Sequence, residues 1–254
     1  MTRAVGPAAP PAEGTAEVWW ARRQDASPRL SGLLDQAEQE RWAAYRHDAD
    51  RERFLVGCGL AKVVIAACTG QRPAEVSLDR TCRQCGRPHG KPAVRRGGPE
   101  LSVAHSGDLV AVAVAVAPVG VDVEKLEGRP HQPGGGDPAA LARMVLAEAE
   151  RAALASVPAS GRARAFLVAW TRKEAVTKAK GDGLRVPFGD VVVAAAAGAP
   201  RLVAWPYPQD PDAVSLVDLD TEAGYVAALA VIGRCEEVRV RDGSALLTGV
   251  RPNR

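Results

Sequence analysis

The chain has few aromatic residues, no long apolar segment and only a slight excess of positive charge. Aromatic side chains make up 4% of its 254 residues, and the net charge is +3. Nucleic-acid surfaces combine clustered Lys and Arg with stacking aromatics, so this composition argues against a nucleic-acid partner. No apolar run approaches the roughly twenty residues of a membrane span, and the first residues lack the apolar core of a signal peptide. We therefore expect a cytoplasmic protein with no membrane association.

Cysteine is also scarce, and its count is odd. The five cysteines do not form the even framework of a disulfide-rich secreted domain; they are Cys58, Cys68, Cys82, Cys85 and Cys235. Cys82-x-x-Cys85 followed by His89 invites a zinc or redox interpretation. Structural zinc needs four ligands, however, and Cys58 and Cys68 fall in a helix that we predict to be buried. The motif therefore lacks an evident fourth ligand.

The bulk composition is that of a globular protein. Hydrophobic residues make up 46% and charged residues 25%, which is enough apolar material for one large domain or two modest ones. Apolar periodicity predicts helices over 33–45, 48–67, 138–156 and 161–180, and strands over 18–21, 101–104, 109–117, 119–124, 191–194, 202–205, 214–219, 225–231 and 238–240. The predicted elements follow the order strand, helices, strands, and this order occurs twice along the chain. Runs of strands beside runs of helices indicate an α+β fold.

Three segments follow from this order. Residues 1–16 are rich in Pro, Ala and Gly and are expected to be disordered. Residues 17–118 form a predicted N-terminal subdomain, and residues 119–254 form a predicted C-terminal subdomain that carries metal-binding acids. Each subdomain is expected to be a small, mostly antiparallel sheet packed with helices.

The most informative feature is a pair of short acidic stretches. In the strand Val119–Glu124, Asp122 and Glu124 share one face because successive side chains alternate. In the helix that follows Trp170, Glu174 and Lys178 lie four residues apart and share a face with Trp170. If the helix face meets the strand, three carboxylates and one ammonium converge, and oxygen ligands of this kind suit Mg2+ together with phosphate groups.

Each element also has an ordinary structural interpretation. Alternating acids usually mark a solvated strand face, but this strand follows a long apolar one and should be fairly central. Glu174 and Lys178 could form an exposed ion pair of about 0.2–0.5 kcal/mol. Trp170 on the same stripe indicates that the helix face is at least partly covered.

Two further residues are candidates for anion binding. His105 is predicted to lie in a turn beside Ser106 and Gly107, where an imidazole can meet an anionic group, although a single histidine is more often structural. Lys91 stands between Gly90 and Pro92, which could hold its ammonium in place, although most such lysines are only solvated.

Taken together in chain order, the motifs resemble those of the 4'-phosphopantetheinyl transferases of the Sfp type. The resemblance is carried by Gly90-Lys91-Pro92, by residues 101–107, by residues 119–124 and by residues 170–181. It covers about Tyr45 to Pro187, including the basic segment 46–51. The resemblance implies a pseudo-symmetric monomer of two α/β subdomains with the active site in the cleft between them.

The implied activity is transfer of the phosphopantetheine group from coenzyme A to a serine of an acyl or peptidyl carrier protein, with release of 3',5'-ADP. By the resemblance, Mg2+ is held by Asp122, Glu124 and Glu174, and coenzyme A is contacted by Arg51, Lys91, His105 and Lys178. Glu174 is the expected base and Lys178 the expected proton donor. The carrier could belong to fatty-acid, polyketide or nonribosomal-peptide synthesis.

Two departures from the family pattern concern nucleotide contacts. Ala104 stands where the family often has Ser, which removes a hydroxyl, and the upstream lysines have no clear match around residues 38–41. Two other functions stay open from the residues alone. One is a binding module that recognises carrier proteins without modifying them, and the other is a Mg2+-dependent phosphohydrolase.

Overall fold

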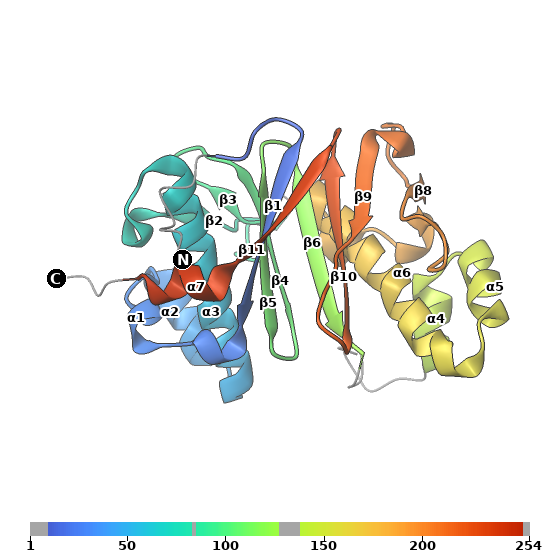
Figure 1. The fold of residues 1–254 in the computed structure, drawn as a ribbon, viewed down its shortest axis with the longest axis horizontal. Helices are drawn as coiled ribbons and strands as arrows, with labels where there is room; N and C mark the ends of the chain where they lie inside the picture. The colour runs from blue at the N-terminus through green and yellow to red at the C-terminus, as the bar shows by residue number, and fades with distance from the viewer. Residues whose placement is uncertain (1–9, 83–84, 127–137, 251–254) are drawn as a thin grey trace, which may run out of the picture. The chain divides into compact units, whose positions relative to one another are not determined.

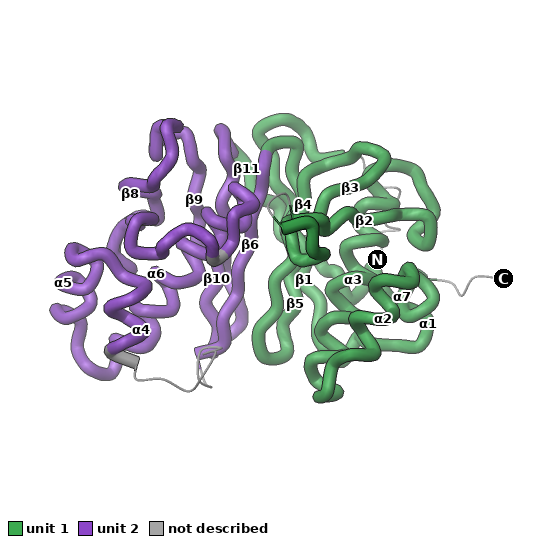
Figure 2. Tube along the Cα trace, turned by 180° about the vertical axis from the view of Figure 1, so that it is seen from behind, with its two compact units in different colours: residues 1–117, 236–254 green, residues 118–235 purple. Residues whose placement is uncertain are grey.

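The computed structural model describes residues 10–82, 85–126 and 138–250. The chain divides into two compact units (Figure 2). Unit 1 comprises residues 1–117 and 236–254, and unit 2 comprises residues 118–235. Unit 2 is thus inserted between two segments of unit 1.

Unit 1 contains a four-stranded sheet in the order β11-β1-β5-β4. Its strands are β1 (Thr15–Arg22), β4 (Glu100–Ser106), β5 (Leu109–Ala115) and β11 (Glu237–Asp242). The pairs β1–β5 and β4–β5 are antiparallel, whereas β11 runs parallel to β1. Every residue of β5 is buried, as expected for an inner strand that is apolar on both faces.

One long helix, α3 (Asp48–Thr69), packs against this sheet and contributes more buried residues to the unit's core than any other described element. It ends at Gly70, whose φ of 73° places it in the left-handed conformation that favours glycine after a helix. The smaller helices are α1 (Pro28–Ser31), α2 (Gln36–Ala44) and α7 (Gly243–Thr248). Two short strands, β2 (Leu78–Asp79) and β3 (Ala93–Val94), pair separately.

Unit 2 is built on a three-stranded antiparallel sheet in the order β6-β10-β9. These strands are β6 (Val119–Lys125), β10 (Tyr225–Ile232) and β9 (Val214–Asp218), and a separate pair is formed by β7 (Val192–Val193) and β8 (Leu202–Ala204). The long helix α6 (Ala159–Lys180) packs along β6 and β10 (Figure 1). The shorter helices are α4 (Pro138–Val145) and α5 (Glu148–Ser156).

Short 3-10 turns complete both units. They are η1 (Arg23–Asp25), η2 (Pro73–Glu75), η3 (Gly183–Arg185), η4 (Phe188–Asp190) and η5 (Pro211–Ala213). In the part of the chain that the structure describes, no helix is both long and apolar enough to cross a membrane.

The predicted α+β class, with small sheets packed by helices, is confirmed. The predicted helix over 138–156 is two helices, because the chain bends between Val145 and Glu148. The strand predicted at 119–124 pairs with β10 at the end of its sheet, so it is not central as expected. Burial of Asp122 comes instead from α6, as shown below.

The ends of the chain differ most from the prediction. Residues 236–254, expected in the C-terminal subdomain, belong to unit 1, because β11 pairs with β1 from Thr15↔Glu237 to Trp20↔Asp242. A short apolar alternation such as Val238–Val240 does not specify which sheet the strand joins, since pairing is decided by tertiary packing. The expected disordered segment 1–16 lies partly outside the described residues, and its last two residues, Thr15 and Ala16, begin β1.

Candidate active site

In unit 2, the strand that carries Asp122 and Glu124 lies against the helix that carries Glu174 and Lys178. Gly120 of β6 explains how they come so close. A Cβ atom built on Gly120 would lie 2.0 Å from the carbonyl oxygen of Ala175 and 2.4 Å from the amide nitrogen of Ala179. Real Cβ atoms do not approach other atoms this closely, so only glycine fits. The backbone of α6 therefore contacts β6 at the turn that carries Glu174 and Lys178.

Asp122, two residues further along the strand, points to the same side. Its side chain is buried, with the residue 5% exposed. Lys178 Nζ donates a hydrogen bond of 2.5 Å to Asp122 Oδ1. Among the described residues, Asp122 Oδ2 has no hydrogen-bond partner. A buried carboxylate oxygen without a partner is costly, so this atom is a natural ligand for an additional cation.

Glu174 and Glu124 complete a local cluster of negative charge. Burial raises the pKa of Glu174 to about 7, the charge of Lys178 opposes the shift, and the charges of Asp122 and Glu124 add to it. Burial likewise raises the pKa of Asp122 against the opposition of Lys178. Repulsion from neighbouring carboxylates therefore disfavours ionisation of Glu174, and the ammonium of Lys178 opposes this effect only in part.

For Lys178, unlike the two carboxylates, the surroundings favour the charged form. Burial would lower the pKa of its ammonium, but the charges of Asp122 and Glu174 outweigh that effect, and the pKa is raised. The raised pKa favours the charged ammonium form of Lys178, whose side chain is 28% exposed. It can contact an anionic group from solvent while it remains paired with Asp122.

The donor set fits the magnesium ion predicted from sequence. Asp122, Glu124 and Glu174 offer only carboxylate oxygens, which a hard divalent cation prefers, and Asp122 Oδ2 has no other partner among the described residues. A divalent cation would also relieve the repulsion that raises the pKa of Glu174. These three residues could therefore hold Mg2+, and Lys178 could bind a phosphate oxygen beside it.

A buried ion pair behind the cluster was not predicted. Lys173, next to Glu174 in α6, is fully buried. Its Nζ donates to Glu150 Oε2 at 2.5 Å and to the backbone carbonyls of Val145 at 2.9 Å and Phe188 at 2.8 Å. Glu150 Oε1 accepts a hydrogen bond from the amide of Val193 at 2.8 Å. Lys173 thereby fixes the part of α6 from which Glu174 projects, and we regard it as a positioning residue.

The sequence did contain a signal for this pair. Lys173 lies on the helical stripe of Ala169 and Val176, and both of these are buried apolar residues. A charged residue on such a stripe is either paired or absent from the core. Its neighbour Arg172 is equally buried and forms two hydrogen bonds, of 2.8 and 2.6 Å, with the carboxylate of Asp218.

Trp170 covers the start of the same helix face, as predicted. Its ring is partly buried and lies 5.3 Å from the ring of Phe188. The helix face that carries Glu174 and Lys178 is therefore packed at its Trp170 end, whereas Lys178 at the other end is partly exposed. An exposed surface ion pair, the alternative interpretation of Glu174 and Lys178, does not describe it.

The remaining predicted residues, Arg51, Lys91 and His105, belong to unit 1. Arg51 donates to the carbonyl oxygen of Tyr45 at 3.0 Å and to Asp48 Oδ1 at 3.3 Å, and its Nε is buried without a partner among the described residues. Lys91 Nζ lies 2.6 Å from Glu100 Oε2. Their predicted contacts with coenzyme A stay predictions.

His105 is not in the turn where we expected it. It lies within β4, opposite Val110 of β5, and its side chain is exposed. Strand β4 extends to Ser106, further than predicted, and the turn consists of Gly107 and Asp108 only. Gly107 has a φ of 56°, which suits glycine in a tight hairpin.

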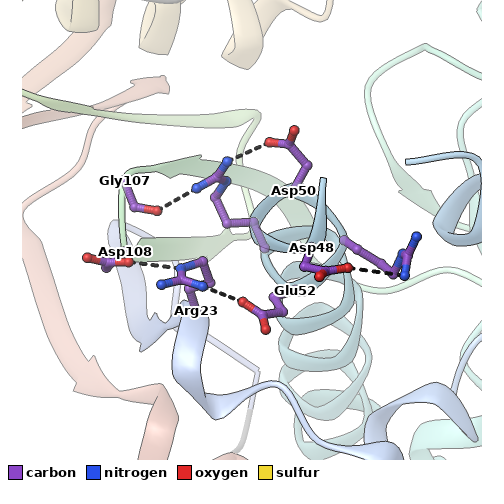
Figure 3. Close-up of polar contacts among 8 residues, drawn as sticks. Arg23, Asp48, Asp50, Glu52, Gly107 and Asp108 are labelled. Carbon is purple, nitrogen blue, oxygen red and sulfur yellow. Dashed lines mark hydrogen bonds and ion pairs between the residues drawn. The ribbon is translucent and has the colours of Figure 1, made fainter. Parts of the chain in front are cut away.

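An ion-pair network joins this hairpin turn to the start of α3 (Figure 3). Arg23 donates to Asp108 at 2.9 Å and also pairs with Glu52. Arg53 donates to the carbonyl oxygen of Gly107 at 2.8 Å and to Asp50 at 2.5 Å. The network fixes the two elements that carry Arg51 and His105 within unit 1.

Comparison with known proteins agrees with these features. Residues 118–230 match the 4'-phosphopantetheinyl transferase superfamily. The 4'-phosphopantetheinyl transferase HetI of Nostoc sp. is 29% identical over 205 residues, which cover 80% of this chain and 81% of that protein. A 4'-phosphopantetheinyl transferase of Bacillus subtilis is 24% identical over 221 residues, which cover 86% of this chain and 92% of the relative.

A third relative is Sfp, the protein that gives its name to the type that the motifs resemble. The 4'-phosphopantetheinyl transferase Sfp of Bacillus subtilis strain 168 is 24% identical over 171 residues, which cover 65% of this chain and 68% of Sfp. The acidic cluster thus lies in the unit that matches a family of group-transferring enzymes. Residues 118–230 form a domain of the 4'-phosphopantetheinyl transferase superfamily.

Proposed function

We propose that this enzyme transfers the phosphopantetheine group of coenzyme A to a serine of an acyl or peptidyl carrier protein, with Mg2+ bound by Asp122, Glu124 and Glu174. The observation that carries the proposal is the buried Asp122, which is paired with Lys178 through one oxygen and has a second oxygen without a partner among the described residues. The family relationship supports the transfer of phosphopantetheine to carrier proteins in general.

In the proposed reaction, the serine oxygen attacks the phosphorus that bears pantetheine. A new phosphorus–oxygen bond forms to serine, the bond to the leaving phosphate of 3',5'-ADP breaks, and the serine proton passes to Glu174. Lys178 faces the bridging phosphates and donates a proton to the leaving phosphate or neutralises its charge. Bound Mg2+ would supply further charge neutralisation on the pyrophosphate.

Arg51, Lys91 and His105 are proposed to contact the nucleotide end of coenzyme A. All three side chains are cationic or can become so, as binding of a 3'-phosphate requires. A monomeric state and a cytoplasmic location also stay predictions from the sequence.

The decisive experiment incubates the protein with coenzyme A, Mg2+ and an apo carrier protein, and measures the mass of the carrier. Transfer adds one phosphopantetheine, about 340 Da, to the carrier. An unchanged carrier with intact coenzyme A would indicate the binding module, and an unchanged carrier with hydrolysed coenzyme A would indicate the phosphohydrolase. Either outcome would overturn the proposal.

Two variants test the assigned roles. Glu174→Gln is expected to lower turnover at least a hundredfold, consistent with loss of a base that typically contributes a factor of about 10²–10⁴. Asp122→Ala is expected to remove the response of the activity to added Mg2+. Unchanged activity of Asp122→Ala across a Mg2+ titration would exclude Asp122 as a metal ligand.

A further inference from the structure

A second cluster of potential metal ligands lies in unit 1, away from the carboxylates of unit 2 in the sequence. It consists of Cys82, Cys85 and His89, on the segment between β2 and β3. One ligand atom from each of the three lies within 4.8 Å of the others. Cys85 Sγ and His89 Nε2 are 2.9 Å apart. The proposed transferase function uses none of these residues.

Two short-range hydrogen bonds hold the backbone near the two cysteines. The amide of Gly86 donates to the carbonyl oxygen of Cys82 at 2.9 Å, and the amide of Cys82 donates to the carbonyl oxygen of Arg87 at 2.8 Å. Gly86 has a φ of 71°, a conformation that side-chain-bearing residues rarely adopt. This tight turn directly after Cys85 brings the two sulfur atoms to the same side as His89.

Much of the described part of this segment is exposed. Among its described residues between Arg80 and Pro92, Cys82 is the one that is buried, and Cys85 and His89 are exposed. The strands that flank it, β2 and β3, pair through two residues each. So short a pair is marginal by itself, whereas a bound metal can supply the missing cross-link, as it does in other small loop-rich elements.

We propose that Cys82, Cys85 and His89 bind one Zn2+ ion, with a water molecule as the fourth ligand. Two thiolates and one imidazole are typical zinc ligands, and the two thiolates neutralise the charge of the ion. Ligand atoms of tetrahedral zinc lie about 3.6 Å apart, so Cys85 and His89 must separate slightly to admit the ion. Binding releases the protons of the thiols to solvent.

This site differs in chemistry from the carboxylate cluster. Sulfur and imidazole ligands select zinc, whereas Asp122 and its neighbours select a hard ion such as Mg2+. Since Lys91 follows His89 by two residues, the zinc ion would also fix the backbone from which Lys91 reaches Glu100. Zinc binding itself does not depend on the proposed transferase function.

The test loads the full-length protein with Zn2+ under reducing conditions, removes unbound metal by dialysis and measures zinc by elemental analysis. Wild type is expected to retain one ion per chain, and Co2+ in its place should give a thiolate-to-cobalt charge-transfer band. Cys85→Ser and His89→Ala, both at exposed positions, should lose the ion while keeping the wild-type circular dichroism spectrum. Cys235→Ser removes a cysteine elsewhere and should retain it.

Hydrogen exchange gives a second measurement. Amide exchange of residues 85–92 should slow on addition of Zn2+ in wild type and in Cys235→Ser, but not in Cys85→Ser. The inference is overturned if wild type retains no zinc, if His89→Ala retains it with an unchanged cobalt spectrum, or if Cys235→Ser loses it as well. A Cys82–Cys85 disulfide that persists under these reducing conditions and prevents zinc uptake would also overturn it.

Discussion

Replacing Glu174 by Gln should stabilise the metal-free protein while it impairs the enzyme. Glu174 has a pKa of about 7 in the folded protein and an ordinary value of 4.5. The difference between these two values corresponds to about 3 kcal/mol of unfavourable free energy for the ionised carboxylate. Glutamine has the same shape without the charge, and partial relaxation of the cluster reduces the gain. We expect Glu174→Gln to raise the free energy of unfolding by about 1–3 kcal/mol at pH 8 in the presence of a chelator.

The pH dependence follows from the direction of the shift. The folded protein holds the Glu174 proton more tightly than the unfolded chain, so wild type loses stability relative to the variant as the pH rises from 4.5 to 7. Below pH 4.5 the carboxyl is protonated in both states, and the difference between wild type and variant should vanish. Urea unfolding followed by circular dichroism at pH 4, 6 and 8 measures this dependence.

Mg2+ should reverse the order of stability. The ion binds the folded wild type and raises its unfolding free energy, whereas Glu174→Gln, with one carboxylate fewer, should gain much less. Glu148→Gln, at an exposed position of α5 in the same unit, serves as a matched control and should change stability by less than about 0.5 kcal/mol at every pH. A Glu174→Gln variant that is less stable than wild type at pH 8 without metal would refute the reasoning.

Substitutions at Gly120 and Lys173 test the packing behind the site, and one at Lys178 tests the site itself. Gly120→Ala places a methyl group where Ala175 O already lies, and should lower the free energy of unfolding by at least about 3 kcal/mol in urea denaturation. Lys173→Met leaves the Glu150 carboxylate buried without its cation and should cost about 3–5 kcal/mol, whereas the double variant Lys173→Met/Glu150→Leu should recover most of that loss. Lys178→Met should raise the Michaelis constant for coenzyme A and lower turnover in the carrier assay, with circular dichroism unchanged.

Local sequence patterns predicted the elements of the site well. The periodicity of residues 48–67 and 161–180 indicated the two long helices, and Gly70 was expected to end the first of them. Asp122 and Glu124 were placed on one strand face because alternation is a local property of the chain. All of these inferences depend on residues that lie within about twenty positions of each other.

The features that the sequence did not reveal depend on distant partners. Lys173 is paired with Glu150, which lies on another helix. Strand β11 is paired with β1, which lies more than two hundred residues earlier in the chain. Gly120 could be recognised as part of a motif, but its contact with Ala175 requires the packed helix. Periodicity shows which face of an element is apolar, and it does not show which other element covers that face.

The return of the chain to unit 1 links the folding of the two units. The amide of Ile232 donates to the carbonyl oxygen of Pro118 at 2.9 Å, so the folded unit 2 begins and ends at adjacent points. If unit 2 unfolded alone, residues 118–235 would become a long flexible loop, and joining β1 to β11 would then require closure of that loop, at an entropic cost of about 4 kcal/mol. Loss of order in unit 2 would therefore weaken the edge of the unit 1 sheet through the chain connection alone.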